Sequence, residues 1–209
     1  ILTHADFRRF LLARLLATLA AQMQTVAVGW QIYAITRDPL DLGLIGLSQF
    51  LPFVILILPA GQAADHYDRR RILTLGYAVE ALCALLLLWF TIESVSVAWP
   101  VFGAMTLLGC ARAFSMPSGQ ALLPNLVPPE DFSRAVALNS SVFQIATVMG
   151  PAMGGLLYLA GPRVVYASVL TLAIIAALLM LRVRGGARTS TTREPATWQT
   201  LAWKRHHER

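Results

Sequence analysis

Charged residues are scarce in this sequence. Only 13% of its 209 residues are Asp, Glu, Lys or Arg, whereas 56% are hydrophobic, and the mean hydropathy is +0.61. Soluble globular domains carry about 25% charged residues, roughly twice this share. Long stretches with one charge or none separate the few charged clusters. This pattern argues against a soluble enzyme, an acidic disordered chain and a secreted disulfide scaffold, and it indicates a membrane protein with several spans.

Cysteine and the motifs of cofactor chemistry are also rare or absent. Cys83 and Cys110 are the only cysteines, and each lies in an apolar run, so we predict small core residues rather than a disulfide or metal site. The sequence has no His-Glu-x-x-His and no Gly-x-x-x-x-Gly-Lys loop. The net charge of +6 comes without a basic stripe that interleaves with aromatics. We therefore expect no metal, no cofactor, no ATP drive and no nucleic acid partner.

Six apolar segments have the length of about 20 residues that a bilayer-crossing helix needs. Turn-forming residues separate them, among them Pro39, Gly161 and Pro162. The predicted fold class is all-α, with six transmembrane helices forming one bundle over residues 1–183. The approximate spans are 10–35, 42–64, 72–92, 97–115, 135–159 and 164–181.

The polar segment 184–209 is predicted to be a cytoplasmic linker. Trp198, Leu201 and Ala202 recur at helical spacing beside Lys204 and Arg205, which suits a short helix on the inner membrane surface. An unstructured linker is the alternative. Because the first residue is Ile1 and no signal peptide precedes the first span, we expect a piece of a longer protein.

Arginines are distributed unequally between the two sides of the predicted bundle. Only Arg37 and Arg163 lie on one side. Lys and Arg are retained on the cytoplasmic side of a membrane, so we predict that both ends of the chain are cytoplasmic. The arginines on the cytoplasmic side are Arg8, Arg9, Arg69, Arg70, Arg71, Arg134, Arg182, Arg184, Arg188 and Arg193.

The loop after the second span combines a glycine, an acid and an arginine cluster. Gly61 permits close helix packing, Asp65 stands where the helix ends, and the arginines hold the next helix at the cytoplasmic face. The loop resembles the signature of the major facilitator superfamily, Gly-x-x-x-Asp-Arg-x-Gly-Arg-Arg. Gly61, Asp65, Arg69 and Arg70 match this gating motif, whereas His66 replaces an Arg and Asp68 replaces a Gly. A positive-inside anchor with an incidental acid is the alternative.

The fifth span contains a proline among small residues. Pro151 bends a helix, and Gly150, Gly154 and Gly155 let a neighbouring helix pack closely. This segment resembles the antiporter motif of facilitator exporters, with Ala146 in place of its first Gly. A close-packed bend without a role in transport is the alternative.

The residues from Arg112 to Pro128 are similar to those of one bacterial subgroup, the proton-driven drug, macrolide and enterobactin exporters. The similarity covers essentially the whole chain and corresponds to the first half of a twelve-span family. It implies the N-terminal bundle of a facilitator fold, with the substrate path between this bundle and a C-terminal six-helix half. It also implies the bacterial cytoplasmic (inner) membrane.

Three charged residues lie inside predicted spans, where each costs about 2.5 to 3.5 kcal/mol. Glu80 lies about 12 Å into the third span, which makes it a candidate proton carrier. Arg112 matches the first position of the family's fourth-span motif, Arg-x-x-Gln-Gly, and is a candidate for coupling. Ser115 and Met116 replace that motif's Gln and Gly. Snorkelling to the cytoplasmic interface is the alternative for Arg14 and Arg112, and a structural or lipid-facing acid is the alternative for Glu80.

Uncharged polar residues recur on single helix faces. Gln24 and Gln31 share a face of the first span, and one face of the fifth span is polar. We predict that these residues line a cavity, with hydrogen bonding between helices as the alternative. The predicted set is Gln24, Gln31, Asn139 and Gln144.

Together these patterns predict a secondary active transporter, a proton-coupled exporter of a small amphipathic molecule such as a drug or siderophore. Its expected partners are that molecule, protons, the lipid bilayer and a C-terminal half. A non-transporting scaffold or assembly subunit is the alternative, and a membrane enzyme is a further one that has no recognisable constellation of catalytic residues.

Overall fold

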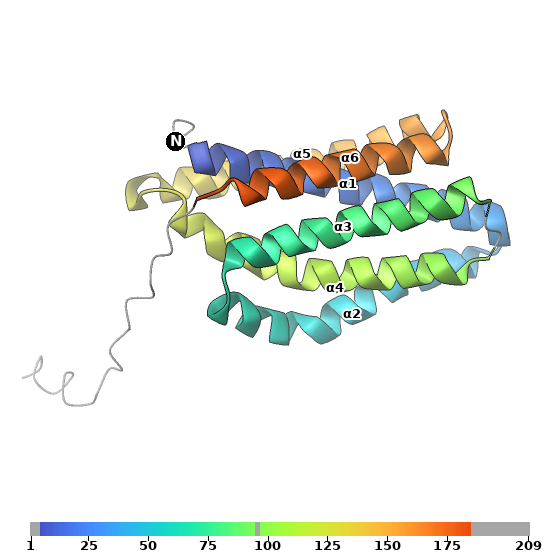
Figure 1. Ribbon diagram of the computed structural model, residues 1–209, viewed down its shortest axis with the longest axis horizontal. Coiled ribbons are helices and arrows are strands. Elements are labelled where there is room, and N and C mark those ends of the chain that lie inside the picture. The colour runs from blue at the N-terminus through green and yellow to red at the C-terminus, as the bar shows by residue number, and fades with distance from the viewer. Residues whose placement is uncertain (1–4, 95–96, 185–209) are drawn as a thin grey trace, which may run out of the picture.

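The computed structural model describes residues 5–94 and 97–184 as a bundle of long helices (Figure 1). The part of the chain that it describes contains no strand, so the all-α prediction is confirmed. The segment from 185 to 209, with the predicted linker and surface helix, lies outside the described residues. The elements are α1 (Ala5–Thr36), α2 (Pro39–His66), α3 (Arg69–Ile92), α4 (Trp99–Leu122), α5 (Phe132–Tyr158) and α6 (Pro162–Leu181), with the short 3-10 turns η1 (Leu123–Asn125) and η2 (Pro129–Asp131).

Most helices extend a few residues beyond the predicted apolar spans, and at the starts of α2 and α3 a polar residue caps the helix. Asp38 accepts a hydrogen bond from the Leu40 N–H at the start of α2, and Asp68 accepts one from the Arg70 N–H at the start of α3. Asp68, which replaces the Gly of the facilitator motif, is therefore the N-cap of α3.

The largest difference from prediction is at α4, which continues to Leu122 instead of ending near residue 115. Pro117, expected in the following loop, lies inside the helix. The reason is tertiary packing. Ser118 is fully buried, and Gly119 packs against Arg14 and Leu73, so the last turn of α4 is held against α1 and α3 despite the proline.

Five of the six helices are long and apolar enough to cross a membrane, namely α1, α2, α3, α5 with the turn before it, and α6. Within the described residues α4 does not reach the same hydropathy, although it has 24 residues. Arg112 lowers its mean hydropathy most, and Gly, Ser and Thr residues lower it further. These small residues suit its position, because α4 packs between α2 and α3 and needs close contact on both sides.

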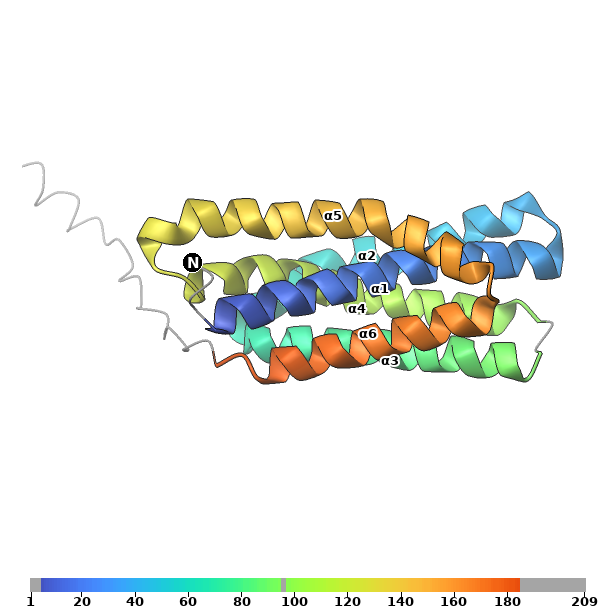
Figure 2. The same ribbon diagram turned by 90° about the horizontal axis from the view of Figure 1, so that it is seen from above.

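The principal helix contacts follow a linear order, α2–α4–α3–α6–α1–α5, with only slight contact between α1 and α2. Figures 1 and 2 show α2 and α5 on the outside of the bundle. One core cluster surrounds Met23 and Met105, and a second surrounds Phe10 and Met180. In α2 only Ile45, Ala60 and Ala64 are buried, so most of its apolar face has no protein neighbour within the described residues.

The loops α2–α3 and α4–α5 and both described ends of the chain lie at one end of the bundle, on the left in Figure 1. We call it the arginine-rich end. There Arg69 donates hydrogen bonds to the carbonyls of Ala64 (3.1 Å) and Ala121 (2.8 Å). Arg70 donates to the Leu181 carbonyl (2.7 Å) and Arg9 to that of Arg182 (3.1 Å). These arginines satisfy carbonyls that the ends of α2, α4 and α6 leave unpaired.

Candidate functional site

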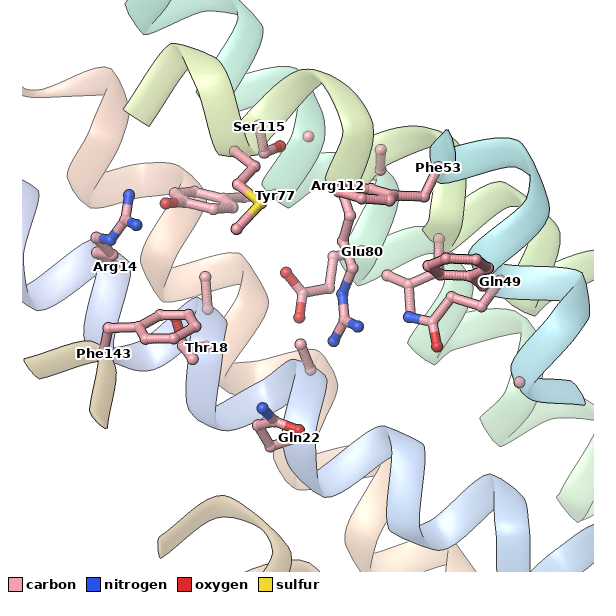
Figure 3. Close-up of a pocket in the computed structure, with 18 residues that line it drawn as sticks. Arg14, Thr18, Gln22, Gln49, Phe53, Tyr77, Glu80, Arg112, Ser115 and Phe143 are labelled. Atoms are coloured by element: carbon pink, nitrogen blue, oxygen red, sulfur yellow. The ribbon is translucent and has the colours of Figure 1, made fainter. Parts of the chain in front are cut away.

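A cavity of about 370 Å³ opens between α1, α2, α3 and α4, and a side chain from α5 also reaches it (Figure 3). Cavities of about 300 to 1,000 Å³ are typical of small-molecule sites. Most of the lining is apolar, and a few polar groups converge in it, as in known binding sites. The lining side chains with polar or aromatic groups are Arg14, Thr18, Gln22, Gln49, Phe50, Phe53, Tyr77, Glu80, Arg112, Ser115 and Phe143.

Glu80 and Arg112, the two residues predicted for coupling, both line this cavity. Glu80 is only 6% exposed, and no described residue forms a hydrogen bond with its Oε1. Figure 3 shows the Glu80 carboxyl group and the Arg112 guanidinium in the same space. Among the described residues they form no ion pair within 4 Å. A buried charge without a direct partner is costly, so this carboxyl group can gain from binding a proton or a ligand donor.

Arg14 also lines the cavity, which differs from snorkelling to the interface. The Arg14 Nε is buried, and none of the residues that the structure describes forms a hydrogen bond with it. The guanidinium packs against Gly119, where a side chain would collide with it. In Figure 3 the Tyr77 hydroxyl points toward Arg14. Because Gly119 has no side chain, the Arg14 guanidinium fits beside α4 inside the bundle.

None of the four polar residues predicted to line a cavity lines this one. Gln24 is fully buried and Asn139 is 9% exposed, whereas Gln144 is exposed on α5. Gln31 donates a hydrogen bond to the Thr91 hydroxyl (3.0 Å) and accepts one from the Tyr166 hydroxyl (2.5 Å). Gln31 thus joins α1, α3 and α6, which is the alternative role that we considered.

Gln22 and Gln49 line the cavity instead, and the sequence analysis missed both. A signal was present in α1, because Arg14, Thr18 and Gln22 stand four residues apart and so share one face. Two residues along a helix turn by about 200°, which places Gln24 on nearly the opposite side from Gln22. The intramembrane charge at Arg14 marked the correct face.

The residues of the gating motif lie at the arginine-rich end and not in the cavity. Nothing lies within 4 Å of a side chain added at Gly61, so the close helix approach expected there is absent in the described part of the chain. Asp65 is exposed, and no ion pair or side-chain hydrogen bond forms between it and any other described residue. Arg69 and Arg70 instead hold helix ends together through the carbonyl contacts described above.

The helix-bend motif brings α5 against α1. A methyl group on Gly154 would lie 2.9 Å from the Met23 Cα, and one on Gly150 would overlap Gln22. No described residue lies within 4 Å of a side chain added at Gly155, so within the described part of the chain the prediction of close packing does not hold there. Pro151 lies inside α5 between the two contact glycines.

Two close approaches were not foreseen. A side chain at Gly109 would overlap the Gln49 carbonyl of α2, and one at Gly76 would overlap Ser115 of α4. Gly109 and Ala113 are four residues apart, the spacing of small-residue helix contacts in membranes. These glycines hold α2, α3 and α4 together around the cavity.

Comparison with known proteins adds an independent result. The family model described as "transmembrane secretion effector", one of the major facilitator models, matches residues 2–198. The staphyloferrin A transporter of Staphylococcus aureus is 28% identical over 136 residues, which are 63% of this chain and 34% of that protein. The enterobactin exporter of Salmonella choleraesuis is 28% identical over 164 residues, 76% of this chain and 38% of that protein.

Macrolide efflux protein A of Streptococcus pyogenes is 25% identical over 123 residues, 59% of this chain and 30% of that protein. The chain thus matches 30 to 38% of the length of these relatives, in their N-terminal half. The shared description is transport or efflux of small molecules.

Proposed function

Since the chain belongs to the transmembrane secretion effector family of the major facilitator superfamily, we propose that the complete protein exports a small amphipathic molecule from a bacterial cell. The molecule is a drug or siderophore, and inward proton movement drives it outward by alternating access. The observation that carries this proposal is the cavity inside a membrane-spanning bundle, lined by an unpaired buried acid and two arginines. The exporter names of the relatives support it.

We propose the following membrane arrangement. All six helices cross the cytoplasmic membrane, α4 included, because α4 has the same length as α3 and packs between two apolar helices. The arginine-rich end faces the cytoplasm. Residues 184–209 form a linker to a second bundle, which packs against the apolar faces of α2 and α5. The exposure of Ile55, Leu58 and Val148 on these faces supports that arrangement.

We propose a distinct role in transport for each of three groups of residues. Glu80 carries the proton. Arg112, across the cavity, interacts electrostatically with the Glu80 carboxylate when it is ionised. Gly61, Asp65, Arg69 and Arg70 form part of a gate at the cytoplasmic face, where Asp65 is free to meet a partner from the second bundle. Gly150, Pro151, Gly154 and Gly155 set the bend of α5 beside α1.

Transport in everted membrane vesicles tests the proposal. Vesicles that carry the complete protein are energised to an acidic interior, and a macrolide or a catecholate siderophore is added while a pH-sensitive dye reports internal protons. An exporter coupled to protons releases protons when its substrate is added and accumulates that substrate. An uncoupler should stop the accumulation.

A scaffold or assembly subunit gives a different result in the same vesicles. Proton release and substrate accumulation would then equal those of vesicles without the protein, for every substrate in the panel. That outcome would reject the transport proposal.

A further inference from the structure

The cavity contains more positive than negative charge. Arg14 and Arg112 bring two guanidinium groups, and Glu80 brings one carboxyl group. No other charged side chain lines it. The lining therefore has a net charge of +1 when Glu80 is ionised and +2 when it is protonated. Its preference for an anion does not depend on the protonation state of Glu80.

Hydrogen-bond donors in the cavity also lack acceptors. Neither guanidinium takes part in an ion pair or a side-chain hydrogen bond with any residue that the structure describes. The Arg14 Nε and the Gln49 Nε2 are buried without partners. Among the described residues, the one fully buried acceptor atom of the lining without a partner is Glu80 Oε1, on a residue that is 6% exposed. Buried donors of this kind are normally satisfied, so a ligand with several acceptor oxygens fits them.

Phenylalanine rings also line the same cavity. Phe50 of α2 and Phe143 of α5 line it and are exposed, whereas Glu80 is buried. Figure 3 shows Phe143 and Phe53 on opposite sides of the space that holds Glu80 and Arg112. The three charged residues are thus less exposed than Phe50 and Phe143. A ligand that matches both parts has an anionic end and an apolar or aromatic body.

We propose that this cavity binds amphipathic anions. Carboxylate or phenolate oxygens bind the guanidinium groups of Arg14 and Arg112 and the Gln49 amide, and the apolar body lies against Phe50, Phe53 and Phe143. The inference rests on the proposed transport function and specifies its substrate class.

A matched set of probes tests this inference on the complete, purified protein in lipid nanodiscs. 2-Naphthoate, 2-naphthamide and 2-naphthylmethylammonium share one aromatic body and differ in charge, and calorimetry gives the dissociation constant of each. The anion should bind at least about tenfold more tightly than the other two. Acetate, which lacks the aromatic body, should bind more weakly than naphthoate.

Substitutions then locate the preference. Arg112→Gln and Arg14→Gln should each reduce the anion preference severalfold, and Arg112→Lys should retain most of it because it keeps the charge. Arg134→Gln is the matched control, because Arg134 is exposed on α5 outside the cavity. Size-exclusion profiles show whether each variant is folded.

The inference is overturned if the amide or the cation binds as tightly as the anion, or if folded Arg112→Gln and Arg14→Gln proteins keep the full preference. The probe series on the unaltered protein decides the question even where a variant does not fold. Proton-coupled transport without an anion preference would reject only this inference. Anion binding without transport would reject only the proposed function.

Discussion

At the scale of single residues, an acid and two arginines share one cavity without direct pairing. Such charges are expensive inside a membrane protein, where each polar group needs a partner. Glu80 is the one acidic residue of the described lining, so binding of a proton there changes the net charge of the cavity. The side chain can change its charge without breaking an existing ion pair, because among the described residues it has none.

Replacing Glu80 by Gln tests the coupling role. Glu80→Gln keeps the size of the side chain and removes its proton exchange, so we expect proton-driven accumulation in everted vesicles to fall to the background. Binding of 2-naphthoate should persist. Glu93→Gln, an acid at the exposed end of α3, is the control and should transport normally. Full transport by folded Glu80→Gln would contradict the role.

A second residue-scale prediction concerns the hydrogen bonds of Gln31. Tyr166→Phe removes the hydroxyl that donates to the Gln31 Oε1 and leaves a buried acceptor unsatisfied. We expect a loss of about 0.6 to 1 kcal/mol in the free energy of unfolding, the usual range for such bonds between membrane helices. Denaturant unfolding of the purified protein measures it.

The control for that bond is Tyr33→Phe, on an exposed tyrosine of α1 for which the described part of the chain offers no hydrogen-bond partner. Equal stability of the two variants would show that the Gln31 contact contributes nothing.

At the scale of helices, adjacent glycines of α5 differ in their surroundings, although their sequence context is nearly the same. Gly154 faces the backbone of α1, and Gly155 faces open space. A backbone neighbour cannot rotate away as a flexible side chain can, so a methyl group at Gly154 must separate the two helices.

Alanine at each position should therefore have opposite effects. Gly154→Ala is expected to destabilise the bundle by about 1 to 3 kcal/mol through overpacking. Gly155→Ala should be neutral or stabilise by up to about 1 kcal/mol, because alanine favours the helix more than glycine does. Thermal unfolding of both variants measures the difference, and a Gly154→Ala protein as stable as Gly155→Ala would refute the close packing.

The helices could be predicted from the sequence because apolar runs of about 20 residues have few alternatives in a membrane protein. Their ends could not be, since Asp38, Asp68 and the packed turn after Pro117 are not apolar. Glu80 was singled out by its charge and depth in the span, and Arg112 by its charge and its match to the fourth-span motif. Gln22 and Gln49 were missed because a single helix does not reveal which of its faces meets its neighbours.

At the scale of the whole molecule, the packing order reveals a symmetry that the sequence does not show. Exchanging α1 with α4, α2 with α5, and α3 with α6 turns the order α2–α4–α3–α6–α1–α5 into its own reverse. The series α1–α2–α3 begins at the arginine-rich end with the start of α1, whereas the series α4–α5–α6 begins at the opposite end with the start of α4. This is the arrangement of an inverted repeat, which transporter bundles use to form a central site.

Thiol labelling tests the orientation of the bundle in the membrane. In the complete protein with Cys83 and Cys110 replaced by alanine, we compare Glu93→Cys with Asp68→Cys. An impermeant maleimide on intact cells should label the first, whereas the second should react only after permeabilisation. The reverse pattern would place the arginine-rich end outside and contradict the proposed orientation.

The linear packing order also determines how firmly each helix is held in the bundle. A closed ring of helices resists bending because every helix is braced on two sides, but here α2 and α5 are each braced mainly by one helix. The α3–α6 contact is the middle of the series, with α2 and α4 on one side of it and α1 and α5 on the other. Among the described residues this is the one extensive contact between the two groups, so the separation of α1 from α2 and α4 depends on its geometry. The cavity lies between the two groups, with residues of α1 and α5 on one side and of α2, α3 and α4 on the other. A change in the angle between α3 and α6 would therefore widen or narrow the cavity.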